Sequence, residues 1–169
     1  VTLDADDGFG GTAQQTFTIT VNDVTAPTVV TQNMTAELDA SGNLSITPQQ
    51  IDNGSSDTEG ITSLTLDVSA FTCGTLGAQT VTLTAEDAAG NSATGTATVT
   101  VVDLIAPIIT LTGNASVTHD AFTAYVDQGA VANDNCTVNL VATDNVNTSV
   151  PGTYTVTYTA TDAGNNVTV

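Results

Sequence analysis

Apolar and polar residues alternate with a period of two in several stretches of the chain. The clearest are residues 17–21 (FTITV), 61–68 (ITSLTLDV), 80–85 (TVTLTA), 97–102 (ATVTVV) and 154–160 (YTVTYTA). A period of two places every second side chain on one face of a strand, and turn-forming residues separate the stretches. The pattern therefore predicts an all-β chain built of antiparallel sandwiches. Residues 116–118 and 122–129 are expected to add further strands.

One long string occurs twice without a gap. Residues 85–107 (AEDAAGNSATGTATVTVVDLIAP) repeat residues 5–27 (ADDGFGGTAQQTFTITVNDVTAP), and a shorter copy, ATDAGNNVTV, stands at 160–169. Each long copy ends in an Asp-containing joint that closes with Ala-Pro, and a joint that recurs once per module marks the boundary between modules. We call residues 23–27 the first joint and residues 103–107 the second joint.

The joints divide the chain into three expected parts. Residues 1–23 are predicted to be the C-terminal part of a preceding module, and residues 24–103 a complete module. Residues 104–169 are predicted to be a module that lacks its last strand. The expected architecture is a tandem of immunoglobulin-like β-sandwich modules arranged end to end, cut from a longer protein.

The charge of the chain excludes several kinds of partner. Lys and Arg together number 0 against 18 Asp and Glu, which gives a formal net charge of -18. Without a basic residue the chain cannot neutralise phosphate, so we expect neither nucleic-acid binding nor attachment to anionic membranes. Two unit charges ~4 Å apart repel by ~4 kcal/mol at an effective dielectric of 20. Bound divalent cations or high salt must offset this repulsion, and both point to an extracellular location.

The two cysteines, Cys73 and Cys136, lie on opposite sides of the second joint. A bridge between them would cross a module boundary, so we expect two unpaired thiols buried as small hydrophobic groups. No apolar run is long enough to span a bilayer, because Asp103 interrupts the best candidate. Direct membrane insertion of this segment is therefore not expected.

Acidic residues recur at three points of each module: a loop rich in Asn and Gly, the turn before the last strand, and the joint. Carboxylates, amide side chains and backbone carbonyls are the oxygen ligands that calcium takes. The turn and the joint that follows it lie at opposite ends of the last strand. The turn should therefore meet the preceding joint, which lies at the same end of the module. We expect Asp23 to group with Asp87 and with Asp52 or Asp57, and Asp103 to group with Asp162 and with Asp127 or Asp134. The alternative is that these residues only form turns and cap their own backbone.

Three segments resemble known families of repeat modules. The strings IDNGSSDTEGI and FTCGTLGAQTVTLTAEDAAGNSATGTATVTV are similar to the hyalin-repeat type of immunoglobulin-like module in bacterial surface proteins. The strings AYVDQGAVANDN and TSVPGTYTVTYTATDAGNN resemble a related bacterial Ig-like module of large adhesins, and DADDGFGGTAQQTFTITVNDVTAP resembles the tail of a cadherin-like repeat. The resemblance implies an extracellular spacer or adhesin stalk, often stiffened by calcium.

The residue inventory argues against an enzyme. A single histidine, His119, and the absence of lysine and arginine leave no ordinary general base with a cationic partner. A structural segment of a cell-surface filament or adhesin stalk is the favoured function, with neighbouring modules, like chains or a surface ligand as partners. The alternative is a carbohydrate- or protein-binding module. Ice binding is a third hypothesis, suggested by the rows of alternating threonine, although threonine is common on solvent-facing strands.

Overall fold

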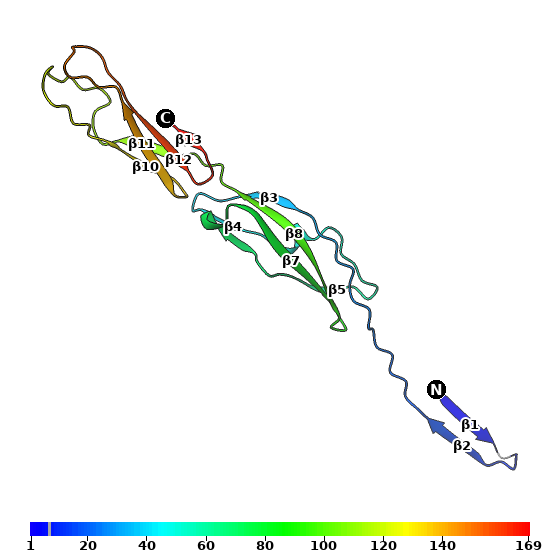
Figure 1. The fold of residues 1–169 in the computed structure, drawn as a ribbon. Helices are drawn as coiled ribbons and strands as arrows, with labels where there is room; N and C mark the ends of the chain where they lie inside the picture. The colour runs from blue at the N-terminus through cyan, green and yellow to red at the C-terminus, as the bar shows by residue number, and fades with distance from the viewer. Residues whose placement is uncertain (7) are drawn as a thin grey trace.

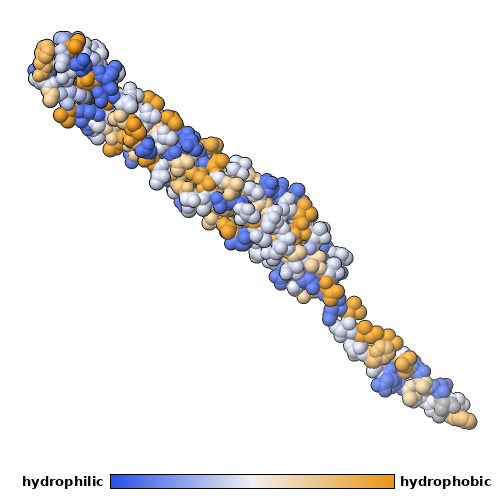
Figure 2. All heavy atoms as spheres, in the orientation of Figure 1, coloured by the Kyte–Doolittle hydropathy of each residue, from blue (hydrophilic) through white to orange (hydrophobic). Residues whose placement is uncertain are grey.

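The computed structural model describes residues 1–6 and 8–169 of the chain. Its elements follow one another along an elongated rod, with a hairpin at one end and the C-terminal sheets at the other (Figure 1). On the face shown in Figure 2, polar and apolar residues are interspersed along the whole rod. The fold is mostly β, as predicted. No helix in residues 1–6 and 8–169 is long and apolar enough to cross a membrane.

The N-terminal hairpin consists of β1 (Thr2–Asp6) and β2 (Thr12–Thr16), which pair antiparallel. Every described residue of both strands is exposed. The strand expected at residues 17–21 does not form: the segment is extended but belongs to no sheet, and Phe17, Ile19 and Val21 are exposed. The matching residues 97–102 do form a strand, because two other strands lie beside them. Alternation alone is therefore not sufficient for a strand; a pairing partner is also needed.

The middle module consists of two sheets. One has the strand order β3-β8-β7-β5, with β3 (Met34–Glu37), β8 (Ser92–Val102), β7 (Gly77–Asp87) and β5 (Ile61–Leu66). The other pairs β4 (Asn43–Ser45) with β6 (Ala70–Thr72). The 3-10 turn η1 (Cys73–Thr75) follows β6, and α1 (Pro48–Ile51) follows β4. The helix is a single capped turn, in which the Thr47 backbone N donates to Gln50 Oε1 at 2.7 Å, and so leaves no helical periodicity in the sequence.

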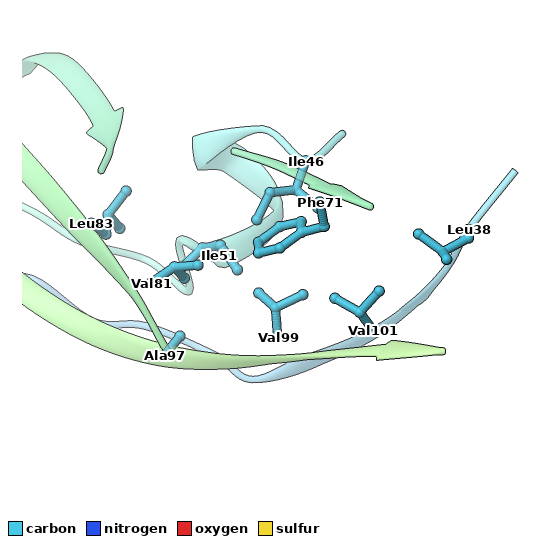
Figure 3. Packing of buried hydrophobic residues seen from close by; sticks show 9 residues of the cluster. All are labelled: Leu38, Ile46, Ile51, Phe71, Val81, Leu83, Ala97, Val99 and Val101. Carbon is cyan, nitrogen blue, oxygen red and sulfur yellow. The ribbon is translucent and has the colours of Figure 1, made fainter. Parts of the chain in front are cut away.

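The core of the middle module lies between these two sheets (Figure 3). Phe71 of β6 and Ile46, which directly follows β4, point toward Val99 and Val101 of β8. The full cluster is aliphatic apart from one ring: Leu38, Ile46, Ile51, Phe71, Val81, Leu83, Ala97, Val99 and Val101. The alternation predicted this inward face, and it places threonines outward in the cross-strand pairs Thr80↔Thr98, Thr82↔Thr96 and Thr84↔Thr94.

One strand pair in this module is parallel, contrary to the expected antiparallel arrangement. β3 pairs with β8 in the parallel register Met34↔Val99 to Glu37↔Val102. A chain that enters a module at one end and leaves at the other must run in the same direction in its first and last strands. When those two strands lie side by side, they are necessarily parallel.

The C-terminal module also has two sheets. β9 (Ile108–Leu111) pairs with β10 (Ala130–Asn133), and β11 (Val138–Asp144), β12 (Val156–Asp162) and β13 (Val167–Thr168) form the second sheet. The strands expected at 116–118 and 122–129 are wrong, because residues 112–129 form loops. Phe122 has a left-handed φ of 64° and is 78% exposed, so the apolar residues of this segment do not alternate into a core.

Candidate metal sites at the module joints

The first joint brings three carboxylates together. Oxygens of Asp23, Asp57 and Asp87 all lie within 4.8 Å of one another. Asp87 is the last residue of β7 and is only 2% exposed, whereas Asp57 comes from the loop after α1 and Asp23 from the joint itself. Segments of the chain that are far apart in sequence thus meet where the middle module begins.

Hydrogen bonds fix the orientation of this group. Asp87 Oδ1 accepts from the backbone N of Ala89 at 2.8 Å and of Asn91 at 2.9 Å. The Asn91 amide Nδ2 donates both to Asp87 Oδ2 at 2.9 Å and to the Asp23 carbonyl at 3.3 Å. Asp23 Oδ1 accepts from Thr25 N at 2.9 Å, but Asp23 Oδ2 is buried without a hydrogen-bond partner. One carboxylate oxygen of the group is therefore buried with no protein donor to satisfy it.

The second joint repeats the arrangement with different neighbours. Asp103 is 2% exposed, and its carboxylate lies within 4.8 Å of that of Asp134. Asp103 Oδ1 accepts from Ile105 N at 3.1 Å and from Asn135 Nδ2 at 3.2 Å. Three further oxygens are buried without a hydrogen-bond partner, and they are Asp103 Oδ2, Asp134 Oδ1 and Asn135 Oδ1.

Asp162 makes the same hydrogen bonds to an asparagine as Asp87 does, although its carboxylate is not part of the group that Asp103 and Asp134 form. Its Oδ1 accepts from Asn166 N and its Oδ2 from Asn166 Nδ2, both at 2.8 Å. The same Nδ2 donates to the carbonyls of Asp103 at 3.0 Å and Ile105 at 3.1 Å. Gly164 permits this approach, because a Cβ there would lie 2.7 Å from the Asp103 carbonyl oxygen. Asn166 thus ties the turn to the joint, as Asn91 does at the first joint.

The structure brings together the first predicted group and only part of the second, because the carboxylate of Asp162 is not among those gathered with Asp103 and Asp134. Asp57 rather than Asp52 joins Asp23 and Asp87, and Asp134 rather than Asp127 joins Asp103. Asp52 instead accepts from Ser55 N at 3.0 Å, and hydrogen bonding by Ser55 lowers its pKa. Asp127 accepts from the Tyr158 hydroxyl. Metal binding by any of the eight aspartates stays a prediction.

Sequence reasoning missed the two asparagines. Asn91 and Asn166 each follow an aspartate by four residues, in the strings DAAGN and DAGNN. The residue before each has a positive φ, 89° at Gly90 and 68° at Asn165, which turns the chain so that the asparagine faces its aspartate. The shared spacing was visible in the sequence and could have identified them.

The ionisation of Asp87 suits a cation ligand. Burial alone would raise the pKa of its carboxyl, but hydrogen bonds from Asn91 and Ala89 keep the pKa below its ordinary value of 3.8. The carboxylate is therefore charged at neutral pH although its side chain is buried. With no Lys or Arg in the chain, no side-chain cation can neutralise the three negative charges of the first joint.

A disulfide crosses the second joint, so the expectation of two free thiols is wrong. Cys73 and Cys136 are bonded, with their Cα atoms 5.6 Å apart. Cys73 belongs to η1 at the end of the middle module, and Cys136 follows Asp134, so both lie at the boundary although they belong to different modules. Asn135 Nδ2 also donates to the Asp39 carbonyl at 3.1 Å across the same boundary. Because Cys136 is bonded to Cys73, its sulfur is not available as a thiolate ligand.

The comparisons with known proteins concern the C-terminal module. Residues 109–169 match the family described as bacterial surface protein, Ig-like domain. The match is to a non-catalytic class of module found in bacterial surface proteins, and together with the disulfide it supports a cell-surface location. No curated protein matches the chain. The resemblances of the earlier segments to hyalin-repeat and cadherin-like modules stay predictions.

Proposed function

We propose that the chain is a segment of a bacterial surface filament or adhesin stalk whose joints are stiffened by calcium. One observation carries the proposal: each joint gathers carboxylates around a buried carboxylate oxygen that has no hydrogen-bond partner, in a chain with no Lys or Arg. An unpaired buried carboxylate oxygen is costly unless an ion neutralises it. Both joints have this feature although their sequences differ.

The donor atoms at both joints are oxygens, which suits calcium better than a softer metal. At the first joint Asp23, Asp57 and Asp87 would hold the ion. At the second joint Asp103 and Asp134 would hold it, with Asn135 Oδ1 as a further oxygen. When bound, calcium would supply the positive charge that the chain lacks.

The residues around each ion come from both sides of a module boundary. At the second joint, Asp103 ends the middle module and Asp134 belongs to the C-terminal one. A ligand set shared between two modules restricts the angle between them, because bending would pull carboxylates off the ion. The disulfide restrains the same boundary covalently, and the main partners of each module are then its own neighbours in the chain.

Small-angle scattering tests this proposal directly. With millimolar calcium we expect the maximum dimension of the chain to match an extended rod, and with chelator we expect a broader, shorter distance distribution. In calcium, the Asp23→Asn variant is expected to be as flexible at its first joint as the unsubstituted chain is in chelator. Superimposable profiles with calcium and with chelator would refute calcium stiffening.

Ice binding is a second candidate function, favoured by the outward threonines of the larger sheet. The pairs Thr80↔Thr98, Thr82↔Thr96 and Thr84↔Thr94 form a regular two-strand ladder. Thr65 of β5 adjoins Thr84, and Thr35 of β3 adjoins Thr100. Strands are ~4.8 Å apart and alternate side chains ~6.8 Å apart along a strand, so methyl and hydroxyl groups repeat in two directions.

A thermal-hysteresis assay decides this second candidate. If the threonine face binds ice, the chain will separate the freezing and melting points, and Thr82→Lys together with Thr96→Lys will abolish the gap. Zero hysteresis at millimolar protein leaves the threonines with their ordinary role, the stabilisation of a solvent-facing sheet through cross-strand pairs.

A further inference from the structure

The end of the rod formed by the C-terminal module contains a large hollow. Loops of residues 112–129 and 146–155 lie at this end of the rod (Figure 1). Together with Val156 and Tyr158 of β12, they line a cavity of about 870 Å³. Its volume lies within the ~300–1,000 Å³ of small-molecule sites. None of the residues at either joint that we assign to calcium lines the cavity.

The tyrosines of the chain converge on this cavity. All three tyrosines, Tyr125, Tyr154 and Tyr158, line it together with His119, the only histidine. The tyrosine rings are half-buried, and the His119 ring meets the Tyr125 ring edge-on with centroids 5.5 Å apart. A chain with only 4% aromatic residues therefore concentrates its tyrosines at one place. This arrangement differs from the core of the middle module, which uses phenylalanine and aliphatic residues.

Hydrogen bonds hold two of these rings in place at the cavity wall. The Tyr154 hydroxyl donates to the Val150 carbonyl at 2.8 Å. The Tyr158 hydroxyl donates to Asp127 Oδ2, and this bond raises the pKa of Tyr158 to about 12. Their ring faces are thus oriented before any ligand arrives, which lowers the entropic cost of binding.

The polar lining includes uncharged amides, hydroxyl groups and His119, and two carboxylates. Asn114, Gln128 and Asn147 offer amide donors and acceptors, and Asp120 and Asp127 offer strong acceptors for hydroxyl donors. No Lys or Arg is present, and the net charge of -18 repels anions. These charges exclude an anionic ligand, and the acceptors and rings suit a ligand that is rich in hydroxyl groups and has an apolar face for the tyrosine rings.

We propose that this cavity binds a neutral oligosaccharide. Sugar hydroxyls would donate to the free lone pairs of Asp127 and to Asp120, while a sugar ring packs against Tyr125. The site gives the filament a recognition function in addition to its mechanical one. The proposal does not depend on calcium at the joints, since the two sets of residues are separate.

Tyrosine fluorescence provides an intrinsic probe of binding at this cavity. It has no Trp, and all three tyrosines line the cavity, so tyrosine emission reports on this site alone. Chitotetraose, laminarihexaose and maltohexaose are the neutral probes, an oligogalacturonate is the anionic probe, and spermidine is the cationic probe. We expect a saturable emission change with at least one neutral probe and none with the oligogalacturonate, with matching heats in calorimetry.

Two variants locate the binding. Asp127→Asn is expected to weaken the sugar about tenfold, the loss expected for one hydrogen bond to a charged group. Tyr125→Ala is expected to weaken it similarly, and Tyr125→Phe to retain the ring contact. Asp144→Asn is the matched control, because Asp144 accepts from Val146 N as Asp127 accepts from Gly129 N, but Asp144 does not line the cavity. Circular dichroism verifies that each variant is folded.

Three results would overturn the proposal. One is that no neutral probe changes the emission or gives heat. The second is that spermidine saturates the signal while the sugars do not, which would make this a site for cations. The third is that binding survives unchanged in both Asp127→Asn and Tyr125→Ala.

Discussion

Calcium added to the chelated chain is expected to raise the melting temperature of both modules by about 10–20 °C. An ion that binds only the folded state at about 100 times its Kd stabilises it by ~2.7 kcal/mol, and ~1 kcal/mol shifts Tm by ~4–8 °C in a domain of this size. Calcium sites of extracellular modules have Kd values of ~0.1–1 mM, so ~10–100 mM calcium is needed to reach 100 times the Kd. Calorimetry or circular dichroism with and without chelator measures the shift.

Single substitutions separate the two sites. Asp103→Asn keeps an oxygen that can accept from Ile105 N and from Asn135 but removes the charge, so it should abolish the calcium shift at the second joint only. Asp23→Asn should do the same at the first joint. Glu86→Gln, an exposed acid of β7, is the charge-matched control and should leave both shifts intact. Equal shifts in Asp103→Asn and the unsubstituted chain would place the ion elsewhere.

Removing the disulfide is expected to destabilise the chain by about 4 kcal/mol. The bridge joins residues that are 63 apart in the sequence. A disulfide that closes a loop of ~15 residues stabilises a protein by ~3 kcal/mol, and one that closes ~100 residues by ~4.7 kcal/mol, so a loop of this length lies between them. The double variant Cys73→Ser, Cys136→Ser should therefore unfold at lower urea concentration. Because the bridge spans the boundary, we also expect one cooperative transition to separate into two.

The stabilisation by the disulfide and the stabilisation by calcium can be measured separately in the same chain. In the double serine variant, calcium should still raise Tm, since Asp103 and Asp134 remain. A reductant added to the unsubstituted chain should reproduce the variant, whereas reductant added to the variant should change nothing. Unfolding curves that are identical with and without the bridge would show that it carries no stability across the joint.

The alternation of residues predicted the strands that have both a partner and a core. β7, β8 and β12 lie where the period of two placed them, because Val81, Leu83 and Val99 are drawn inward by burial. Residues 17–21 have the same pattern and form no strand. Pairing depends on neighbours that the local sequence does not contain, and this limits prediction from a pattern alone.

The sequence predicts the candidate metal sites only in part. The repeat fixed which joint meets which turn, so Asp23 with Asp87 followed from strand direction. The choice of Asp57 over Asp52 depends on the shape of one loop, which the sequence leaves open. The disulfide is not predicted, because the two cysteines belong to different modules in the sequence, whereas in the structure Cys73 and Cys136 are neighbours across the boundary.

The parallel pair of β3 and β8 determines how the middle module responds to tension. β3 is attached to the incoming chain and β8 to the outgoing chain, so pulling on the filament slides one strand past the other along their length. In this shear geometry the ladder bonds between Met34↔Val99 and Glu37↔Val102 are loaded together rather than one at a time. Tearing the module open requires their simultaneous rupture, so the path of the chain through the sandwich itself confers mechanical strength.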